Sequence, residues 1–226
     1  IDWILSKFAD HAARPRGAPL FAVGVSLGGN ALMRWAGESG AAAASRVDAL
    51  AAICAPLDLA AGGAALGRGL NRRIYTPMFL RTLKPKAMAK LAQFPGLFDP
   101  QLLQAARDLY DFDNVFTAPL HGFRDTPDYW ARASAKPGLR HVRVPSLVVN
   151  PLNDPFIPAA SLPGHAEVSP QVTLWQPRHG GHVGFAHGPW PGHLTGLPGA
   201  VGGWLLEHAG WSVQRPVAAD GSRTAQ

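Results

Sequence analysis

The sequence has a single cysteine, Cys54, among 226 residues, and this scarcity excludes an internal disulfide. Cys54 lies in the apolar stretch 50–55, so we expect a small buried side chain rather than a reactive thiol. A membrane-spanning helix needs about 18 consecutive apolar residues, and no such run is present. The best stretch, 49–66, is interrupted by Pro56 and Asp58.

A signal peptide is not indicated either, because Asp2, Lys7 and Asp10 interrupt the first ten residues. Hydrophobic residues make up 47% of the chain and charged residues 16%, which is typical of a globular protein and not of a disordered one. We therefore expect a cytoplasmic protein with one large core. A peripheral contact with a membrane surface stays open.

Acidic residues are absent between Asp58 and Asp99, and we call residues 59–98 the basic segment. It holds seven bases: Arg68, Arg72, Arg73, Arg81, Lys84, Lys86 and Lys90. The whole chain has 21 basic and 15 acidic residues, so this segment accounts for the net charge of +6. Two interpretations stay open, a solvated basic face or attraction to anionic lipid headgroups. Nucleic acid is disfavoured, because aromatic residues do not alternate with the bases.

Four short apolar runs, at 20–23, 48–55, 144–150 and 172–176, predict buried strands. Their lack of polar alternation is typical of a parallel sheet that is covered on both faces. Helical spacing follows the first run and recurs at 1–13 and 200–208. Strands that alternate with helices predict an α/β fold with a parallel sheet and flanking helices.

The interval 57–139 has short helical patterns, many prolines and no strand pattern. We expect it to be a helical lid inserted into an α/β core that comprises residues 1–56 and 140–212. The polar residues 213–226 are expected to form a disordered tail.

A serine lies between glycines where the first predicted strand meets a helical pattern, in the stretch Gly24–Val25–Ser26–Leu27–Gly28–Gly29. A strand that turns sharply into a helix holds the residue at the bend out for chemistry, and glycines remove side chains that would clash there. A serine hydroxyl needs a base, and the base needs an anion, before it becomes a nucleophile.

Both partners follow later strands. Asp154 comes four residues after the third predicted strand, and the loop after the fourth offers His179, His182 and His187. Gly180 and Gly181 give the backbone freedom to bring His182 over the edge of the sheet. The order Ser26, Asp154, His182 is that of an α/β-hydrolase triad.

The sequence resembles the α/β-hydrolase superfamily and, within it, the YheT-like branch of candidate esterases. The matching stretches are GVSLGGN (24–30), FDNVFTAPLHGF (112–123), DYWARAS (128–134), VPSLVVNPLNDPF (144–156) and HGGHVGF (179–185). The resemblance implies Ser26 as nucleophile, His182 as base and Asp154 as acid, with no metal or cofactor. The sequence departs from the family pattern at Asn153, where the family usually has a second aspartate.

The resemblance also implies that about a third of the family's fold precedes the serine, including a loop that supplies half of the oxyanion hole. Here Ser26 follows only 25 residues. We therefore expect an N-terminally truncated chain, in which the backbone N–H of Leu27 is one oxyanion donor and the second is missing. Loss of one donor costs about 10²–10³ in turnover, so such a fragment could be inactive. An anchor in the missing part stays open.

The predicted substrate is a small-molecule or lipid carboxylic ester, acylglycerols among them. A thioesterase, an amidase or an acyltransferase with the same triad is the alternative, since one fold hosts all of these activities. The third hypothesis is a protein without enzymatic activity, either an inactive fragment or a hydrolase-like binding module. Four residues of the lid, His121, Phe123, Tyr129 and Trp130, are candidates for the wall of a substrate pocket or for packing of the lid on the body. Asp125 and Asp128 are expected to cap a helix or lie on the surface. The oligomeric state stays open.

Overall fold

The structure, a computed structural model, describes residues 1–11, 18–190 and 192–208. Its centre is one parallel sheet with the strand order β1–β2–β3–β4. The strands are β1 (Phe21–Val25), β2 (Ala49–Ile53), β3 (Ser146–Val149) and β4 (Val172–Trp175). Each corresponds to one of the four predicted runs, within a few residues at the ends. The predicted tail, 213–226, lies outside the described residues.

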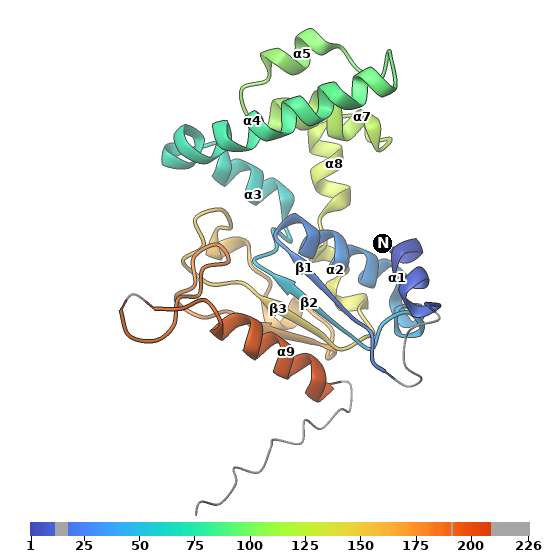
Figure 1. Cartoon of the computed structure of the whole chain (residues 1–226), viewed down its shortest axis with the longest axis vertical. Coiled ribbons are helices and arrows are strands. Elements are labelled where there is room, and N and C mark those ends of the chain that lie inside the picture. The colour runs from blue at the N-terminus through green and yellow to red at the C-terminus, as the bar shows by residue number, and fades with distance from the viewer. Residues whose placement is uncertain (12–17, 191, 209–226) are drawn as a thin grey trace, which may run out of the picture.

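Helices cover both faces of the sheet, as Figure 1 shows. One face packs against α2 (Leu27–Ser39), and the other packs against α9 (Gly196–His208). Because side chains of a strand alternate between faces, Leu50 and Ala52 of β2 join the α2 cluster, whereas Ala51 joins the α9 cluster. This explains the absence of polar residues from β2 and confirms the predicted α/β fold.

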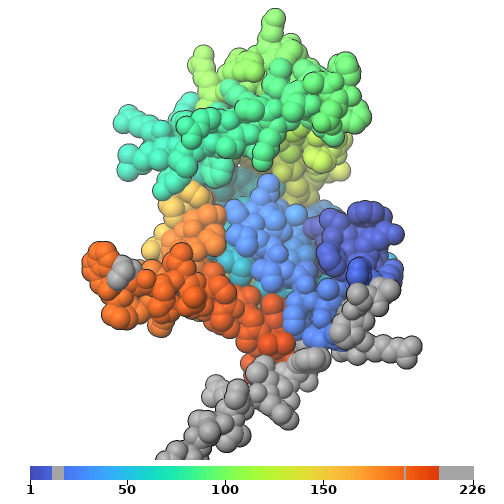
Figure 2. Space-filling view, in the orientation of Figure 1, coloured from blue at the N-terminus to red at the C-terminus, as the bar shows by residue number. Residues whose placement is uncertain are grey.

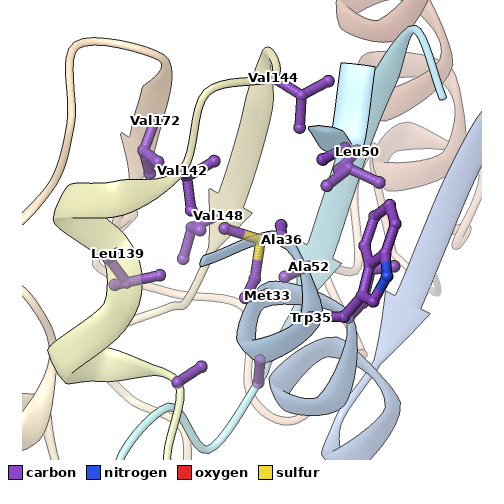
Figure 3. Close-up of a cluster of buried hydrophobic side chains, with 14 of the residues drawn as sticks. Met33, Trp35, Ala36, Leu50, Ala52, Leu139, Val142, Val144, Val148 and Val172 are labelled. Atoms are coloured by element: carbon purple, nitrogen blue, oxygen red, sulfur yellow. The ribbon is translucent and has the colours of Figure 1, made fainter. Parts of the chain in front are cut away.

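The α2 cluster is the larger of the two and contains Met33, which is fully buried (Figure 3). Val148 of β3 and Leu139 of η3 (Lys136–His141) face the same cluster. This packing fixes the start of α2 relative to the carboxyl ends of the strands. The position of residue 26 follows from it, because Ser26 directly precedes α2.

A helical region connects β2 to β3 and contains no strand between residues 54 and 145, all of which are described. Its elements are α3 (Leu59–Leu66), α4 (Gly69–Gln93), α5 (Pro100–Ala105), α6 (Leu109–Phe112), the π-helical turn η2 (Asp113–Thr117), α7 (Ala118–Leu120) and α8 (Thr126–Ala133). Figures 1 and 2 show that this region stands beyond one end of the sheet. It has a small core of its own, which includes Leu80, Leu103 and Phe112.

The remaining described elements are α1 (Asp2–Ala9), η1 (Gly40–Ser45), η4 (Ala159–Ser161) and η5 (His165–Glu167). None of the described helices is both long enough and apolar enough to cross a membrane. In the described part of the chain β1 is an edge strand, and its Val23 and Val25 side chains are about half exposed, 51% and 48%.

Candidate active site

Ser26 lies at the bend between β1 and α2, with φ 51° and ψ −125°. A positive φ is uncommon for a residue with a side chain and costs free energy, which the surrounding backbone must supply. The N–H of Ser26 donates to the carbonyl of Ile53 at 2.8 Å, and this bond ties the bend to the end of β2. The bend at Ser26 is therefore held by a hydrogen bond to the neighbouring strand.

Two glycines allow this bend to be tight. A Cβ atom on Gly24 would lie 2.5 Å from the carbonyl oxygen of Gly28. A Cβ atom on Gly29 would lie 2.8 Å from that of Ala55. Both distances are shorter than real contacts, so the strand and the helix approach each other only because side chains are missing here.

The three predicted catalytic side chains meet in one hydrogen-bonded chain. The Oγ atom of Ser26 lies 3.1 Å from Nε2 of His182, and Nδ1 of His182 lies 2.8 Å from Oδ2 of Asp154. An ionised carboxylate only accepts hydrogen bonds, so Nδ1 carries the proton and donates to Asp154. Nε2 is then the unprotonated nitrogen and can accept the hydroxyl proton of Ser26.

Asp154 is held in the loop after β3, and its side chain is fully buried. Its second oxygen, Oδ1, accepts the N–H of Phe156 at 2.8 Å. The Phe156 ring also packs on the imidazole of His182, with 4.5 Å between ring centres. One short segment therefore positions the Asp154 carboxylate and restricts the rotation of the His182 ring.

The histidine loop is fixed by two further contacts. The N–H of Gly181 donates to Oδ1 of Asn153 at 2.9 Å, and the N–H of Val183 donates to Sγ of Cys54 at 3.3 Å. The amide of Asn153 thus has a structural role next to Asp154, at the position where the family resemblance implies an aspartate. Gly181 has a φ of 60°, which fits the freedom expected of this loop.

Cys54 is completely buried, as the sequence predicts. Burial raises the pKa of its thiol from 9.0 to about 11, so the thiolate is scarce at neutral pH. In the described residues its sulfur forms a cluster with ligand atoms of Asp154 and His182, all within 4.8 Å of one another. A metal site there would need the thiolate and would compete with the His182–Asp154 hydrogen bond, so the donor set does not fit a metal.

A cavity of about 280 Å³ opens directly in front of Ser26 and His182. Its other walls come from α3, α4, α6, η2 and α8 and from the loop after β3, and most of the side chains are apolar or aromatic. The helical region therefore encloses the space next to the serine. Such a space suits the hydrocarbon part of a ligand that has its polar group at the triad.

Of the four lid residues singled out in the sequence, Tyr129 and Trp130 line this cavity, and His121 and Phe123 are not among its lining residues. His121 is exposed, and the Phe123 ring packs against Tyr129 with 5.3 Å between ring centres. The pocket-wall interpretation therefore fits two of the four residues, whereas the ring contact of Phe123 lies within the helical region and not between that region and the sheet domain. Tyr129 and Trp130 form pocket wall, and Phe123 supports the wall from outside.

The acidic residues of α8 have the roles expected of them. Asp125 is the N-cap residue and accepts the N–H of Asp128 at 2.8 Å. The Asp128 carboxylate accepts the N–H of Arg124 at 3.1 Å and pairs with the side chains of Arg124 and Arg132. Both carboxylates thus stabilise the helix and lie outside the hydrogen-bonded chain of Ser26, His182 and Asp154.

Two residues of the site were missed in the sequence. Asp113 lines the cavity, and its Oδ2 accepts the indole N–H of Trp130 at 2.9 Å. Burial raises the pKa of Asp113, and the hydrogen bonds from Thr117 and Trp130 oppose that rise. Asn30 is buried and joins α2 to the end of α8, since it donates to the carbonyl of Ala133 and accepts the N–H of Ala135. Both lie inside the stretches that carry the family resemblance.

Comparison with known proteins agrees with this fold, although no family model matches the chain. The chain is 35% identical over 193 residues to YheT of Escherichia coli (strain K12), which is named as a candidate esterase; the match covers 84% of this chain and 56% of YheT. It is 31% identical over 186 residues to Phospholipase ABHD3 of Mus musculus, and this match covers 82% of this chain and 44% of ABHD3. The chain thus spans about half the length of these relatives.

Among solved structures, a monoacylglycerol lipase of Paleococcus ferrophilus is similar over 92% of this chain and 72% of its own, with 18% identity and a TM-score of 0.47. The sequence matches to YheT and ABHD3 cover more than four fifths of the chain. The parallel sheet has Ser26 at the expected bend. The chain belongs to the α/β-hydrolase superfamily, in the branch that includes YheT.

Proposed function

We propose that the protein hydrolyses carboxylic esters through an acyl-enzyme, with Ser26 as nucleophile, His182 as general base and Asp154 as the acid that orients the base. The observation that carries this proposal is the unbroken hydrogen-bonded chain Ser26–His182–Asp154, with distances of 3.1 and 2.8 Å. Those distances are within the reach required for proton transfer between a nucleophile and its base.

In the first half of the reaction, Oγ of Ser26 attacks the ester carbonyl carbon while Nε2 of His182 takes the hydroxyl proton. The imidazolium that forms is stabilised by the carboxylate of Asp154. The tetrahedral intermediate then expels the alcohol, which receives the proton from His182. Ser26 is left as an acyl ester.

In the second half, His182 accepts a proton from a water molecule that attacks the acyl carbon. The intermediate collapses to a carboxylic acid, and His182 returns the proton to Oγ of Ser26. No net proton or electron is left on the enzyme, so the cycle balances as ester plus water giving acid plus alcohol.

The oxyanion of both intermediates is proposed to be stabilised by the backbone N–H of Leu27. Leu27 is the first residue of α2, so its N–H has no acceptor within the helix. The 13-residue helix also points its positive end toward the developing negative charge. Leu27 lines the same cavity as Ser26, which supports this assignment.

We infer that residues 57–139 form the lid of this site and that the acyl part of the substrate occupies the cavity beneath it. Leu59, Leu66, Phe79 and Phe112 come from this region and give the cavity an apolar lining. A lipid ester, including an acylglycerol, matches that lining. Two relatives support a lipid ester as the substrate: one from Mus musculus is named as a phospholipase, and one from Danio rerio is named as a monoacylglycerol lipase.

We also propose that the basic segment brings the enzyme to anionic membrane surfaces. Six of its seven bases, all except Lys84, are exposed, and α4 contains no acidic residue. Lys84 instead donates to the carbonyls of Gln104 and Ala106 at 2.7 Å. On the exposed face of α4, Leu70, Ile74 and Met78 form an apolar stripe with a spacing of four residues. Bases beside an apolar stripe match a surface of acidic headgroups over hydrocarbon.

The direct test of the reaction class is a comparison of matched substrates that share one acyl group as an oxygen ester, a thioester and an amide. We expect the highest kcat/KM with the oxygen ester, and loss of turnover in the Ser26→Ala variant. Faster turnover of the thioester or the amide would replace the proposal with one of those activities. Ester hydrolysis that persists in Ser26→Ala would reject it.

A further inference from the structure

Trp130 lines two cavities. It lines the cavity of about 280 Å³ that contains Ser26 and His182. It also lines a second, larger cavity of about 500 Å³, whose walls include Ala131 and Ser134 and the charged side chains of Lys136, Arg140 and Glu167. No other described residue is common to the walls of these two cavities.

Three neighbours hold the indole ring in this position. Its Nε1–H donates to Oδ2 of Asp113 at 2.9 Å, and its ring meets that of Tyr110 edge to face with 5.6 Å between centres. On the side of α3 the ring lies against Gly63, where a Cβ atom would come within 2.5 Å of Cζ2 of Trp130. The space beside α3 therefore accommodates the indole ring of Trp130 only because residue 63 is a glycine, which has no side chain.

We propose that Trp130 is the partition that closes the acyl cavity and thereby limits the length of the acyl group, and that Asp113 is the residue that positions this partition. The inference rests on the proposed ester hydrolysis, since it assigns the cavity to the acyl part of that substrate. It also gives a purpose to the FDNVFT and DYW stretches, which carry the family resemblance without taking part in the triad.

The sizes of the two cavities determine how much the partition limits the length of the acyl group. A volume of about 280 Å³ is just below the range of roughly 300–1,000 Å³ for small-molecule sites, so it suits a short or medium acyl chain. If the indole is the partition, its removal joins this space to one of about 500 Å³. A longer chain could then pass the position of residue 130 and continue along Ala60, Ala131 and the aliphatic stem of Lys136.

Acyl-length profiles of Trp130→Ala and Leu66→Ala test the partition. Leu66 lines only the first of the two cavities, so its truncation enlarges that cavity without opening it to the other. With straight-chain p-nitrophenyl esters of increasing length, kcat/KM of the unmodified protein should stop rising at a short or medium chain. In Trp130→Ala it should continue to rise for several more methylenes, by up to about fourfold for each. Leu66→Ala should shift the limit much less.

The role of Asp113 is tested by a pair of variants. Asp113→Leu removes the acceptor of the indole N–H, so the ring loses one restraint and the length limit should weaken part of the way toward that of Trp130→Ala. Asp113→Asn keeps an acceptor oxygen and should restore the original length limit. A role in stability alone would lower the melting temperature of Asp113→Leu and leave the length profile unchanged.

Binding measured without turnover separates this inference from the proposed function. Calorimetry of straight-chain methyl ketones with Ser26→Ala and with Ser26→Ala/Trp130→Ala needs no catalysis. We expect affinity to level off at a shorter chain length in the first protein than in the second. Equal length limits in the two would overturn the partition, whatever the activity assays show. A difference in binding without any ester hydrolysis would overturn the proposed function and keep the partition.

Discussion

Nε2 of His182 lies 3.1 Å from Oγ of Ser26, although 156 residues separate the two in the sequence. Ser26 follows β1, and His182 lies in the loop that follows β4. Because all strands are parallel, their carboxyl ends share one edge of the sheet, and loops that leave this edge can meet. The contact is thus a product of the topology and not of local sequence.

The first prediction distinguishes the two histidines of this loop. His182→Ala should reduce kcat by about 10⁴-fold or more, because Ser26 loses its base. His179 is exposed and lies outside the hydrogen bonds that join the triad, so His179→Ala should change kcat little. Steady-state kinetics with a small soluble ester measures both. The reverse ranking would move the base to His179.

A second prediction concerns Asn30, which joins α2 to the end of α8. Asn30→Ala leaves the carbonyl of Ala133 and the buried N–H of Ala135 without this partner. Each lost partner costs about 1–3 kcal/mol, so the free energy of unfolding should fall by about 2–6 kcal/mol in a denaturant titration. Gln104→Ala, which removes an exposed amide side chain, is the control and should stay within about 0.5 kcal/mol. Equal stability of the two variants would contradict the structural role of Asn30.

The third prediction is a loss of stability in alkali. Burial raises the pKa of Cys54 from 9.0 to about 11, so the thiol stays protonated in the fold while it ionises in the unfolded chain. The unfolded state therefore binds fewer protons between pH 9 and 11, and the free energy of unfolding falls as pH rises through this window. Each unit of pKa difference corresponds to about 1.4 kcal/mol.

Cys54→Ala should remove the contribution of the thiol to the alkaline loss of stability, whatever the effect of the substitution at neutral pH.

Burial, together with the charge of Asp113, raises the pKa of Tyr129 from 10.0 to about 12. Tyr129→Phe should therefore flatten the decline between pH 10 and 12 in the same way. Denaturant titrations across pH, read as the difference between each variant and the unmodified protein, isolate both effects. Parallel pH curves would show that neither group titrates differently in the fold.

The fourth prediction concerns the basic segment. Binding to vesicles with anionic lipid should exceed binding to neutral vesicles, and added salt should weaken it. Each base near the surface contributes about 1 kcal/mol, so the double variant Arg72→Glu/Arg73→Glu should bind at least about 30-fold more weakly. Turnover of a small soluble ester should stay unchanged, because neither residue lines the active-site cavity. Co-sedimentation measures the binding.

Lys7→Glu/Arg178→Glu makes the same change in net charge at exposed positions outside the basic segment. This control should bind anionic vesicles more strongly than the Arg72→Glu/Arg73→Glu variant. Equal loss in both variants would attribute the attraction to net charge alone. Equal binding to neutral and anionic vesicles would leave the basic segment as a solvated face.

The strands and the residues of the candidate triad could be predicted from sequence because each has a local signal, whereas the contacts between those residues depend on the topology. An apolar run that ends in glycines around Ser26 predicts both a strand and a sharp turn, whatever the rest of the chain does. The loops that carry Asp154 and His182 follow from the positions of the strands before them. Burial of Cys54 follows in the same way from its place in β2's apolar run.

The walls of the cavity could not be predicted, because they depend on packing between distant segments. Phe79 and Asp113 reach the cavity through the way α4 and η2 pack against the other helices of the helical region, and no spacing in the sequence carries that information. The same limit explains why Phe123 and Tyr129, which are close in sequence, take different places. Asp113 could have been identified as a candidate from the sequence, because it lies in a stretch that carries the family resemblance.

The central claim, that Ser26 is an activated nucleophile, is tested most directly by labelling with a fluorophosphonate probe and mapping the modified residue by mass spectrometry. The proposed triad predicts one adduct on Ser26, with labelling abolished in Ser26→Ala and strongly slowed in His182→Ala. An adduct on another residue, or labelling of Ser26→Ala at the original rate, would contradict the account.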